Sequence, residues 1–203
     1  MKKHVSLEKH QFTTILEAAV SGFYQEVKIL QSVIGFNEIS NGCGELSFQA
    51  LFDHAIRSLE SEEILTINQF YEKKDSGNGV FDLLVLNRKN SELNALIECK
   101  YQSSNENEPS SEYWKPKNTE AYYDKVERQA MSYMKNSTLF KNVSVPYIVV
   151  LTFSVVKFDD KGAIEKWQFY DGLLENEFYE FVIFTEGGIN YGLAVYGRIK
   201  SLN

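Results

Sequence analysis

The sequence predicts an α/β fold in which helices flank a mixed central β-sheet. Two observations indicate this class: amphipathic helical segments precede a series of strand-like runs, and a further helical segment separates three of these runs from a strongly β-forming one. Short turn-like segments join the first three runs, which favours antiparallel pairing. The run after the later helix can return parallel beside them as a crossover, so the sheet is expected to be mixed.

Helical periodicity predicts three helices. Residues 11–34 place apolar side chains three and four positions apart, which is typical of an amphipathic helix. The segment SNGCGE (40–45) predicts a break through its two glycines, followed by a second helix over about 45–60. A third helix is expected over about 118–136. The inward positions of the second helix would be Leu46, Ala50, Leu51, Ile56 and Leu59.

Strand-like runs account for most of the remaining chain. KDSGNG (74–79) and RKNSE (88–92) have the turn chemistry that closes hairpins between the early strands. A polar segment with two prolines, 102–118, is expected to be a long loop. Strands are predicted at 64–71, 80–87, 93–101 and 146–156, with further ones at 166–171, 179–186 and 191–199.

The composition favours one globular domain of 203 residues, of which 43% are hydrophobic. We divide it into an N-terminal helical segment (1–40), a core (45–156) and C-terminal strands (157–203). Two cysteines without CxxC spacing argue against a disulfide scaffold and fit a reducing cytoplasm. No apolar run is long enough for a membrane span, and the N-terminus lacks the apolar region of a signal peptide. We therefore expect a cytoplasmic protein without membrane partners.

The stretch NALIECKYQ (94–102) contains ionisable residues inside a predicted strand. Residues two apart in a strand share a face, so Glu98 and Lys100 lie on one face and Ile97, Cys99 and Tyr101 on the other. Ionised groups among apolar strand residues need a partner or a metal, because losing their hydration is costly.

Asp82 lies within the preceding strand-like run, VFDLLVL (80–86), sixteen positions before Glu98. If the two strands pair, the two carboxylates lie on the same face, where they repel each other unless a cation lies between them. Mg²⁺, or Mn²⁺ as a substitute, supplies that charge and takes oxygen ligands. Lys100 can then orient or help deprotonate a water and balance the charge of a phosphoryl transition state.

A helix is followed by a strand that carries an aspartate and then by a strand that carries E-x-K. This arrangement resembles the PD-(D/E)XK nuclease superfamily with its restriction-endonuclease-like αβββαβ core. The resemblance covers roughly residues 45–156 and implies that Asp82 and Glu98 are metal ligands and Lys100 is the catalytic lysine. One departure is Phe81, where the family's pattern often has proline.

The resemblance also implies further site residues. Many members add a glutamate from the preceding helix, for which Glu45 is our choice and Glu60 the rival. RecB-like members carry Q-x-x-x-Y on the helix after the third strand, and Gln129 and Tyr133 fit that pattern four residues apart. Gln129 and Tyr133 would then position the site or the substrate.

The net charge of −7 gives the protein no general attraction to nucleic acid. The segment 113–141 is an exception, with six positive and three negative residues, and it flanks the proposed site. Its basic side chains could contact a phosphate backbone, and its aromatic ones could stack on bases. The candidate nucleic-acid contacts are Lys115, Lys117, Lys125 and Arg128.

Together these features predict a Mg²⁺-dependent nuclease that hydrolyses DNA phosphodiester bonds. RNA as the substrate and a homodimer stay open, and the sequence does not choose among restriction, phage defence, repair and mobile-element processing. The alternative is an inactive nuclease-fold protein that acts as a protein–protein interaction module, such as an immunity or regulatory subunit.

Each residue also has a purely structural interpretation. The Asp and E-x-K residues could form a surface ion pair, and Gln129 and Tyr133 could be a helix-packing pair. Glu45 could simply favour the N-terminal dipole of a helix that begins there. Cys99 points to the opposite face from Glu98, so a packed core thiol is the preferred interpretation over a nucleophile.

Overall fold

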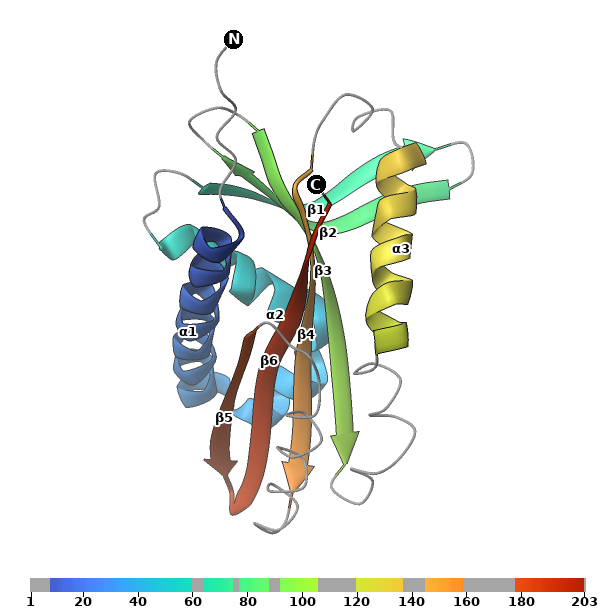
Figure 1. Ribbon diagram of the computed structural model, residues 1–203. Helices are drawn as coiled ribbons and strands as arrows, with labels where there is room; N and C mark the ends of the chain where they lie inside the picture. The colour runs from blue at the N-terminus through green and yellow to red at the C-terminus, as the bar shows by residue number, and fades with distance from the viewer. Residues whose placement is uncertain are drawn as a thin grey trace.

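The computed structural model describes residues 8–59, 64–74, 77–87, 92–105, 120–136, 145–158 and 178–202 (Figure 1). Helices α1 and α2 open the chain, and α3 follows the third strand. The elements are α1 (Lys9–Ile34), α2 (Phe36–Ser58), β1 (Ile64–Lys74), β2 (Gly77–Asn87), β3 (Glu92–Asn105), α3 (Glu120–Asn136), β4 (Tyr147–Phe158), β5 (Phe178–Glu186) and β6 (Ile189–Ser201).

The described strands form one six-stranded mixed sheet in the order β1-β2-β3-β4-β6-β5. β3 and β4 are parallel, and the other neighbours are antiparallel. Because α3 lies between β3 and β4 in the sequence, it is the crossover that parallel pairing requires. The predicted α/β class, the mixed sheet and the early hairpins are therefore confirmed. Within the described residues, no helix is both long and apolar enough to cross a membrane.

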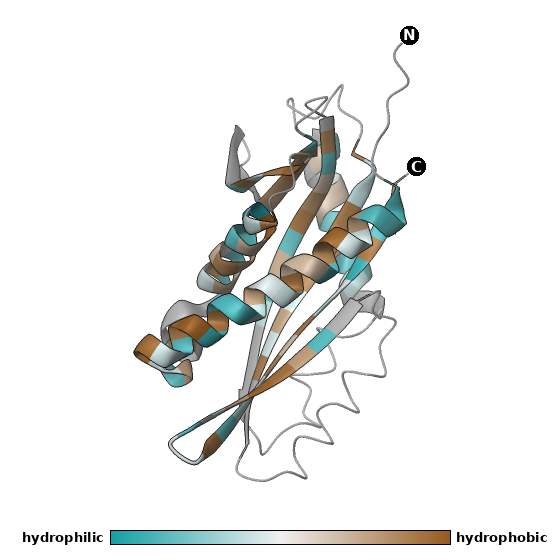
Figure 2. Ribbon diagram, turned by 90° about the vertical axis from the view of Figure 1, so that its left-hand side faces the viewer, coloured by the Kyte–Doolittle hydropathy of each residue, from teal (hydrophilic) through white to brown (hydrophobic). Residues whose placement is uncertain are grey.

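Helices α1 and α2 cover one face of the sheet, and α3 packs on the other (Figure 1). The larger core lies beneath α1 and α2, where the Phe23 ring packs against Phe48, Phe52 and Phe153 with centroids 5.8, 6.4 and 5.2 Å away. Aromatic pairs of this kind contribute about 0.5–1.5 kcal/mol each beyond their buried area. Figure 2 shows apolar residues along the central strands and alternating apolar and polar residues along the helices.

The predicted break at SNGCGE is wrong. The backbone stays helical through Gly42 and Gly44, and the two helices meet at Gly35, which has φ +84°. A glycine inside a helix costs only about 1 kcal/mol relative to alanine, which tertiary packing of the helix can outweigh. A left-handed φ, in contrast, strongly favours glycine, so Gly35 ends α1 and allows α2 to begin.

The predicted inner face of α2 is wrong in part, because Leu51 and Leu59 pack against the core as predicted but Ala50 is exposed. Leu46 is exposed, whereas Phe48, Phe52 and Ala55 are buried together with the polar Gln49 and Asp53. Ile56 is buried as predicted. The error follows from treating every buried position as apolar, because this helix buries a polar row against the sheet.

β2 and β3 pair along only part of their length. Their described pairs run from Asn87↔Glu92 to Leu83↔Ile97, while β2 stays paired with β1 as far as Gly77 and β3 stays paired with β4 as far as Asn105. The β1–β2 hairpin therefore diverges from β3 beyond Leu83, as Figure 1 shows. We call this divergence the fork.

Replacing Gly35 with alanine is expected to destabilise the fold by about 2–3 kcal/mol. A Cβ there would lie 2.3 Å from Glu186 Oε1, and the backbone would keep an unfavourable left-handed φ. Glu186 Oε2 accepts hydrogen bonds from the N–H groups of Phe36 and Asn37 at 2.7 and 3.2 Å, so the clash would also disturb the N-terminal cap of α2. Urea denaturation measures the loss.

Gly188→Ala is the matched control, because Gly188 has nearly the same φ, +83°, and an added Cβ there meets nothing within 4 Å. It should therefore lose only the backbone contribution, about 1–2 kcal/mol. Equal losses in the two variants would show that the Glu186 cap does not constrain Gly35.

Candidate active site at the fork

At the fork, side chains bond to backbone groups of the diverging strands. The Asp82 carboxylate accepts a hydrogen bond from the Cys99 N–H at 2.7 Å through Oδ2, and the Glu45 carboxylate accepts one from the Tyr101 N–H at 3.0 Å through Oε2. On the other strand, the Asp82 carbonyl accepts a hydrogen bond from Gln49 Nε2 at 2.7 Å. These bonds occupy backbone groups of the diverging strands and hold the carboxylates of Asp82 and Glu45 at the fork.

Asp82, Glu98 and Lys100 converge from the two diverging strands. Lys100 Nζ lies 3.6 Å from Glu98 Oε2 and 3.8 Å from Asp82 Oδ2, and it donates a hydrogen bond to the Cys99 carbonyl at 2.7 Å. Ile97 and Cys99 instead belong to the core beneath α1 and α2. The predicted division of β3 into a charged face and an apolar face is thus confirmed, and the charged side chains form one cluster.

Glu98 has an unusual electrostatic environment. Glu98 is only 7% exposed. Burial is the largest cause that raises the pKa of its carboxyl from 4.5 to about 8, and repulsion from Asp82 is the second. The positive charge of Lys100 lowers this pKa and so opposes both effects. Its Oε1 atom is buried and has no hydrogen-bond partner in the part of the chain that the structure describes. Without a further positive charge, Glu98 therefore favours its protonated form at neutral pH.

The pair Asp82 and Glu98 fits a hard divalent cation. Mg²⁺ is usually held by one or two carboxylates and keeps several waters, and the unpaired Glu98 Oε1 is a ready oxygen ligand. Across the described ranges, no three Asp, Glu, His or Cys side chains are grouped closely enough to hold a metal ion, so the structure does not bring Glu45 into one cluster with this pair.

Glu45 reaches the fork from α2. The residue lies in the interior of α2, nine positions after its first residue, so the interpretation of Glu45 as a helix-start residue that favours the dipole is wrong. Its carboxylate binds the backbone of β3 at Tyr101, two residues beyond the contact of Asp82 with the same strand. Glu45 therefore borders the site, and its role as a metal ligand stays a prediction.

Three of the remaining predicted site residues with described side chains lie on α3. Gln129 is exposed on this helix, as are Lys125 and Arg128. Their proposed roles stay predictions. Four other candidates fall outside the described residues or side chains: Glu60, Lys115, Lys117 and Tyr133.

α3 is attached to the sheet by ion pairs as well as apolar contacts. Glu127, 1% exposed, accepts a hydrogen bond from Arg198 at 2.9 Å and one from Lys200 at 2.6 Å, and Asp124 lies 3.1 Å from Arg198. Two of the three acidic residues in the basic segment therefore pair with β6.

The sequence prediction missed a polar row on α2. Gln49, Asp53 and Arg57 follow Glu45 at intervals of four, so all four lie on one side of the helix. The signal was present in the sequence as polar residues at every fourth position. We call these four residues the α2 polar row; it faces the β1–β2 hairpin and the fork.

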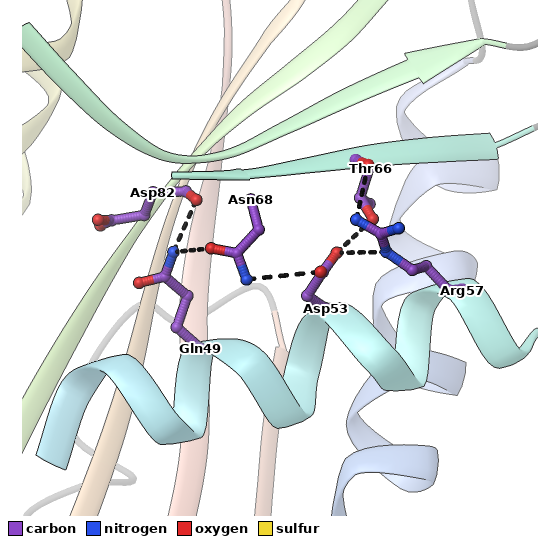
Figure 3. Close-up of polar contacts among 6 residues, drawn as sticks. All are labelled: Gln49, Asp53, Arg57, Thr66, Asn68 and Asp82. Atoms are coloured by element: carbon purple, nitrogen blue, oxygen red, sulfur yellow. Dashed lines mark hydrogen bonds and ion pairs between the residues drawn. The ribbon is translucent and has the colours of Figure 1, made fainter. Parts of the chain in front are cut away.

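Gln49, Asp53 and Arg57 of the α2 polar row form a continuous network with β1 (Figure 3). Gln49 Nε2 donates to Asn68 Oδ1 at 2.8 Å, and Asn68 Nδ2 donates to Asp53 Oδ2 at 3.4 Å. Asp53 Oδ1 also accepts hydrogen bonds from Thr66 and, at 3.1 Å, from Arg57 Nε. The network links the helix to the hairpin and ends at the Asp82 carbonyl.

A second polar strip lies beside Lys100 on β4. Thr152 is the register partner of Lys100, and Thr152 and Ser154 are both fully buried. Within the described residues, neither hydroxyl has a hydrogen-bond partner. Buried hydroxyls without protein partners commonly bind ordered water, so this strip extends the polar surface of the site.

Cys99 is a packed core thiol, as preferred from the sequence. It is fully buried, and burial raises the pKa of its thiol well above the ordinary value. A thiol that stays protonated is a poor nucleophile.

Comparison with known proteins adds no relative: no protein-family model matches the chain, and neither a curated protein nor a solved structure is significantly similar to it.

Proposed function

We propose that the protein is a Mg²⁺-dependent nuclease that hydrolyses DNA phosphodiester bonds on a restriction-endonuclease-like core. The observation that carries the proposal is the convergence of Asp82, Glu98 and Lys100 at the fork, with Lys100 Nζ within 3.8 Å of both carboxylates. The helix, the three strands, the crossover helix and the parallel fourth strand follow the order that the resemblance implies.

In this proposal Asp82 and Glu98 hold the cation. Asp82 is anchored through Oδ2 to the Cys99 N–H and through its carbonyl to Gln49, so its position is fixed from two directions. Glu98 would supply the unpaired Oε1 and would bind the cation as a deprotonated carboxylate. Bound Mg²⁺ would contribute Lewis-acid polarisation of the phosphate and a lower pKa for a bound water.

Lys100 is the electrostatic catalyst. Its hydrogen bond to the Cys99 carbonyl holds the ammonium beside the two carboxylates. A cation there balances negative charge that develops on the phosphoryl oxygens as water adds to phosphorus and the 3′ oxygen leaves. The attacking water's proton passes to solvent and the leaving 3′ oxygen takes a proton from solvent, so the products carry a 5′-phosphate and a 3′-hydroxyl, as the resemblance implies.

DNA is the proposed partner. The exposed Lys125 and Arg128 lie on α3, which packs on the sheet face that carries Glu98 and Lys100. Contacts to phosphates would position the strand without reading its sequence.

The experiment that tests the proposal incubates plasmid, linear and single-stranded DNA, and an RNA strand, with the protein in Mg²⁺. Cleavage that EDTA abolishes is the expected result. Glu98→Gln, which removes a cation ligand and keeps the side-chain size, should lower cleavage at least about 100-fold. No cleavage of any substrate under Mg²⁺ or Mn²⁺ would contradict the proposal and favour the interaction-module alternative.

Glu180→Gln is the matched control for Glu98→Gln. Glu180 is an exposed acid on β5, at the far edge of the sheet from the β1–β2 hairpin. Its replacement removes the same charge from the protein as Glu98→Gln does, so cleavage should stay at the wild-type rate. Equal losses in both variants would assign the effect to net charge and not to the site.

A further inference from the structure

The two ends of the Gln49 side-chain amide differ: among the described residues, its nitrogen donates two hydrogen bonds and its oxygen accepts none. Its Nε2 donates to the Asp82 carbonyl at 2.7 Å and to Asn68 Oδ1 at 2.8 Å. Its Oε1 is buried and has no hydrogen-bond partner among the described residues, and the whole residue is fully buried. A buried amide oxygen without a donor is unfavourable, and ordered water is the usual way in which such an atom is satisfied.

The orientation of the Gln49 amide follows from its partners. The Asp82 carbonyl can only accept, so it requires the nitrogen of Gln49. At the other end, Asp53 accepts from Arg57 and from Asn68 Nδ2, so Asn68 presents its oxygen to Gln49. Both contacts therefore fix Nε2 in place, and Oε1 must point elsewhere. Figure 3 shows Oε1 on the side of the Asp82 carboxylate, away from Asp53.

Gln49 is also close to two of the three acidic residues at the fork, Asp82 and Glu45. It bonds directly to the backbone of Asp82, and it lies one helical turn after Glu45, whose carboxylate bonds to β3. A water bound to a hard cation points its hydrogens away from the ion, so it can donate a hydrogen bond to an acceptor at the border of the site, such as Gln49 Oε1. Mg²⁺ bound through two carboxylates keeps several such waters.

We propose that Gln49 is a positioning residue of the ion site, with Nε2 holding the backbone of Asp82 and Oε1 accepting a hydrogen bond from a cation-bound water. This inference rests on the proposed function. It differs from a purely structural role, in which Gln49 would only attach α2 to the hairpin. Outer partners of this kind change metal affinity, which a structural attachment would not.

The first test measures Mn²⁺ binding without DNA, by electron paramagnetic resonance of the free ion, in the wild type and in Gln49→Met. The variant keeps the side-chain length and removes both the donor and the acceptor. The expected result is a Kd at least about tenfold higher. A Kd within twofold of the wild type would overturn the inference and leave the proposed function standing.

Thr66→Val is the matched control, since it removes the Thr66–Asp53 hydrogen bond at the far end of the same network. It should lower the Tm and leave the Mn²⁺ Kd within twofold of the wild type. If Thr66→Val weakens Mn²⁺ binding as much as Gln49→Met does, the effect belongs to the stability of the network and the inference fails.

The second test uses the wild type and does not depend on folding of a variant. In ¹⁵N-labelled protein, the side-chain amide resonances of Gln49 should shift when Mg²⁺ is added and should stay unchanged in Glu98→Gln. Unchanged Gln49 resonances in a wild type that binds Mg²⁺ would overturn the inference alone. A wild type that binds neither Mg²⁺ nor Mn²⁺ would overturn the proposed function and, with it, this inference.

Discussion

Lys100→Met is expected to lower the rate of DNA cleavage about 100- to 1,000-fold while Mn²⁺ binds at least as tightly as in the wild type. The rate falls because the ammonium that balances the developing phosphoryl charge is gone. Affinity is retained or rises, because a positive charge 3.6 and 3.8 Å from the two carboxylates no longer competes with the cation. Single-turnover cleavage at saturating Mn²⁺ and Mn²⁺ titration without DNA measure the two effects separately.

Slower cleavage with retained Mn²⁺ affinity would distinguish Lys100 from the carboxylates, because Glu98→Gln should both slow cleavage and weaken Mn²⁺ binding. Lys28→Met, at an exposed position on α1, is the control and should change neither. Wild-type cleavage by Lys100→Met would refute a catalytic role. A loss of Mn²⁺ binding in step with cleavage would show instead that the substitution disrupts the site.

Glu98→Gln is expected to make the cation-free protein more stable than the wild type at high pH. The pKa of Glu98 is about 8 in the folded protein and 4.5 ordinarily, so the folded state binds this proton more tightly than the unfolded state does. The resulting stabilisation is complete below about pH 4.5 and is lost as the pH rises to about 8, a difference of order 3–5 kcal/mol. Glutamine has no proton to lose, so the variant lacks this decline.

Urea denaturation in EDTA at pH 5, 7 and 9 measures this difference for the wild type and Glu98→Gln. Adding Mg²⁺ at pH 9 should raise the stability of the wild type, because the cation replaces the lost proton at Glu98, and should leave the stability of the variant unchanged. Glu180→Gln, an exposed acid, should follow the wild-type curve. Parallel pH profiles for wild type and Glu98→Gln would show that burial does not affect this carboxyl as described.

The strands and the charged face of β3 could be predicted because both depend on the two-residue alternation of side chains along a strand, which is visible in the local sequence. Alternation determines which residues share a face, and the turn chemistry at 88–92 predicts that the strands of Asp82 and Glu98 are antiparallel neighbours, so the meeting of these two residues could be predicted from the sequence. The structure agrees, with the last described β2–β3 pair, Leu83↔Ile97, directly beside these two residues.

The end of α1 at Ile34 agrees with the predicted helix over 11–34, but the start of α2 directly after Gly35 could not be predicted by the same reasoning. Gly35, Gly42 and Gly44 are all candidate breaks locally, and the choice among them depends on tertiary contacts. Glu186, 151 positions later in the chain, caps α2 at Phe36 and Asn37 and thereby selects Gly35. A capping partner so distant in sequence leaves no local signal.

Gln49 was missed for a related reason. The four-residue spacing of the α2 polar row was visible, but its partner at the fork is the backbone carbonyl of Asp82, which any residue possesses. Asp82 has no register partner on β1 or β3 among the described pairs, and its carbonyl accepts a hydrogen bond from a side chain of α2 instead. Contacts between side chain and backbone across a fork therefore follow from geometry and not from residue pattern.

A crystal structure of the wild type soaked in Mn²⁺, with anomalous difference density, tests the central claim most directly. We expect one strong peak in contact with a carboxylate oxygen of Asp82 and with Glu98 Oε1, with Lys100 Nζ nearby and the peak absent in Glu98→Gln. A fork without anomalous density at saturating Mn²⁺, or an ion bound only elsewhere on the protein, would contradict the account.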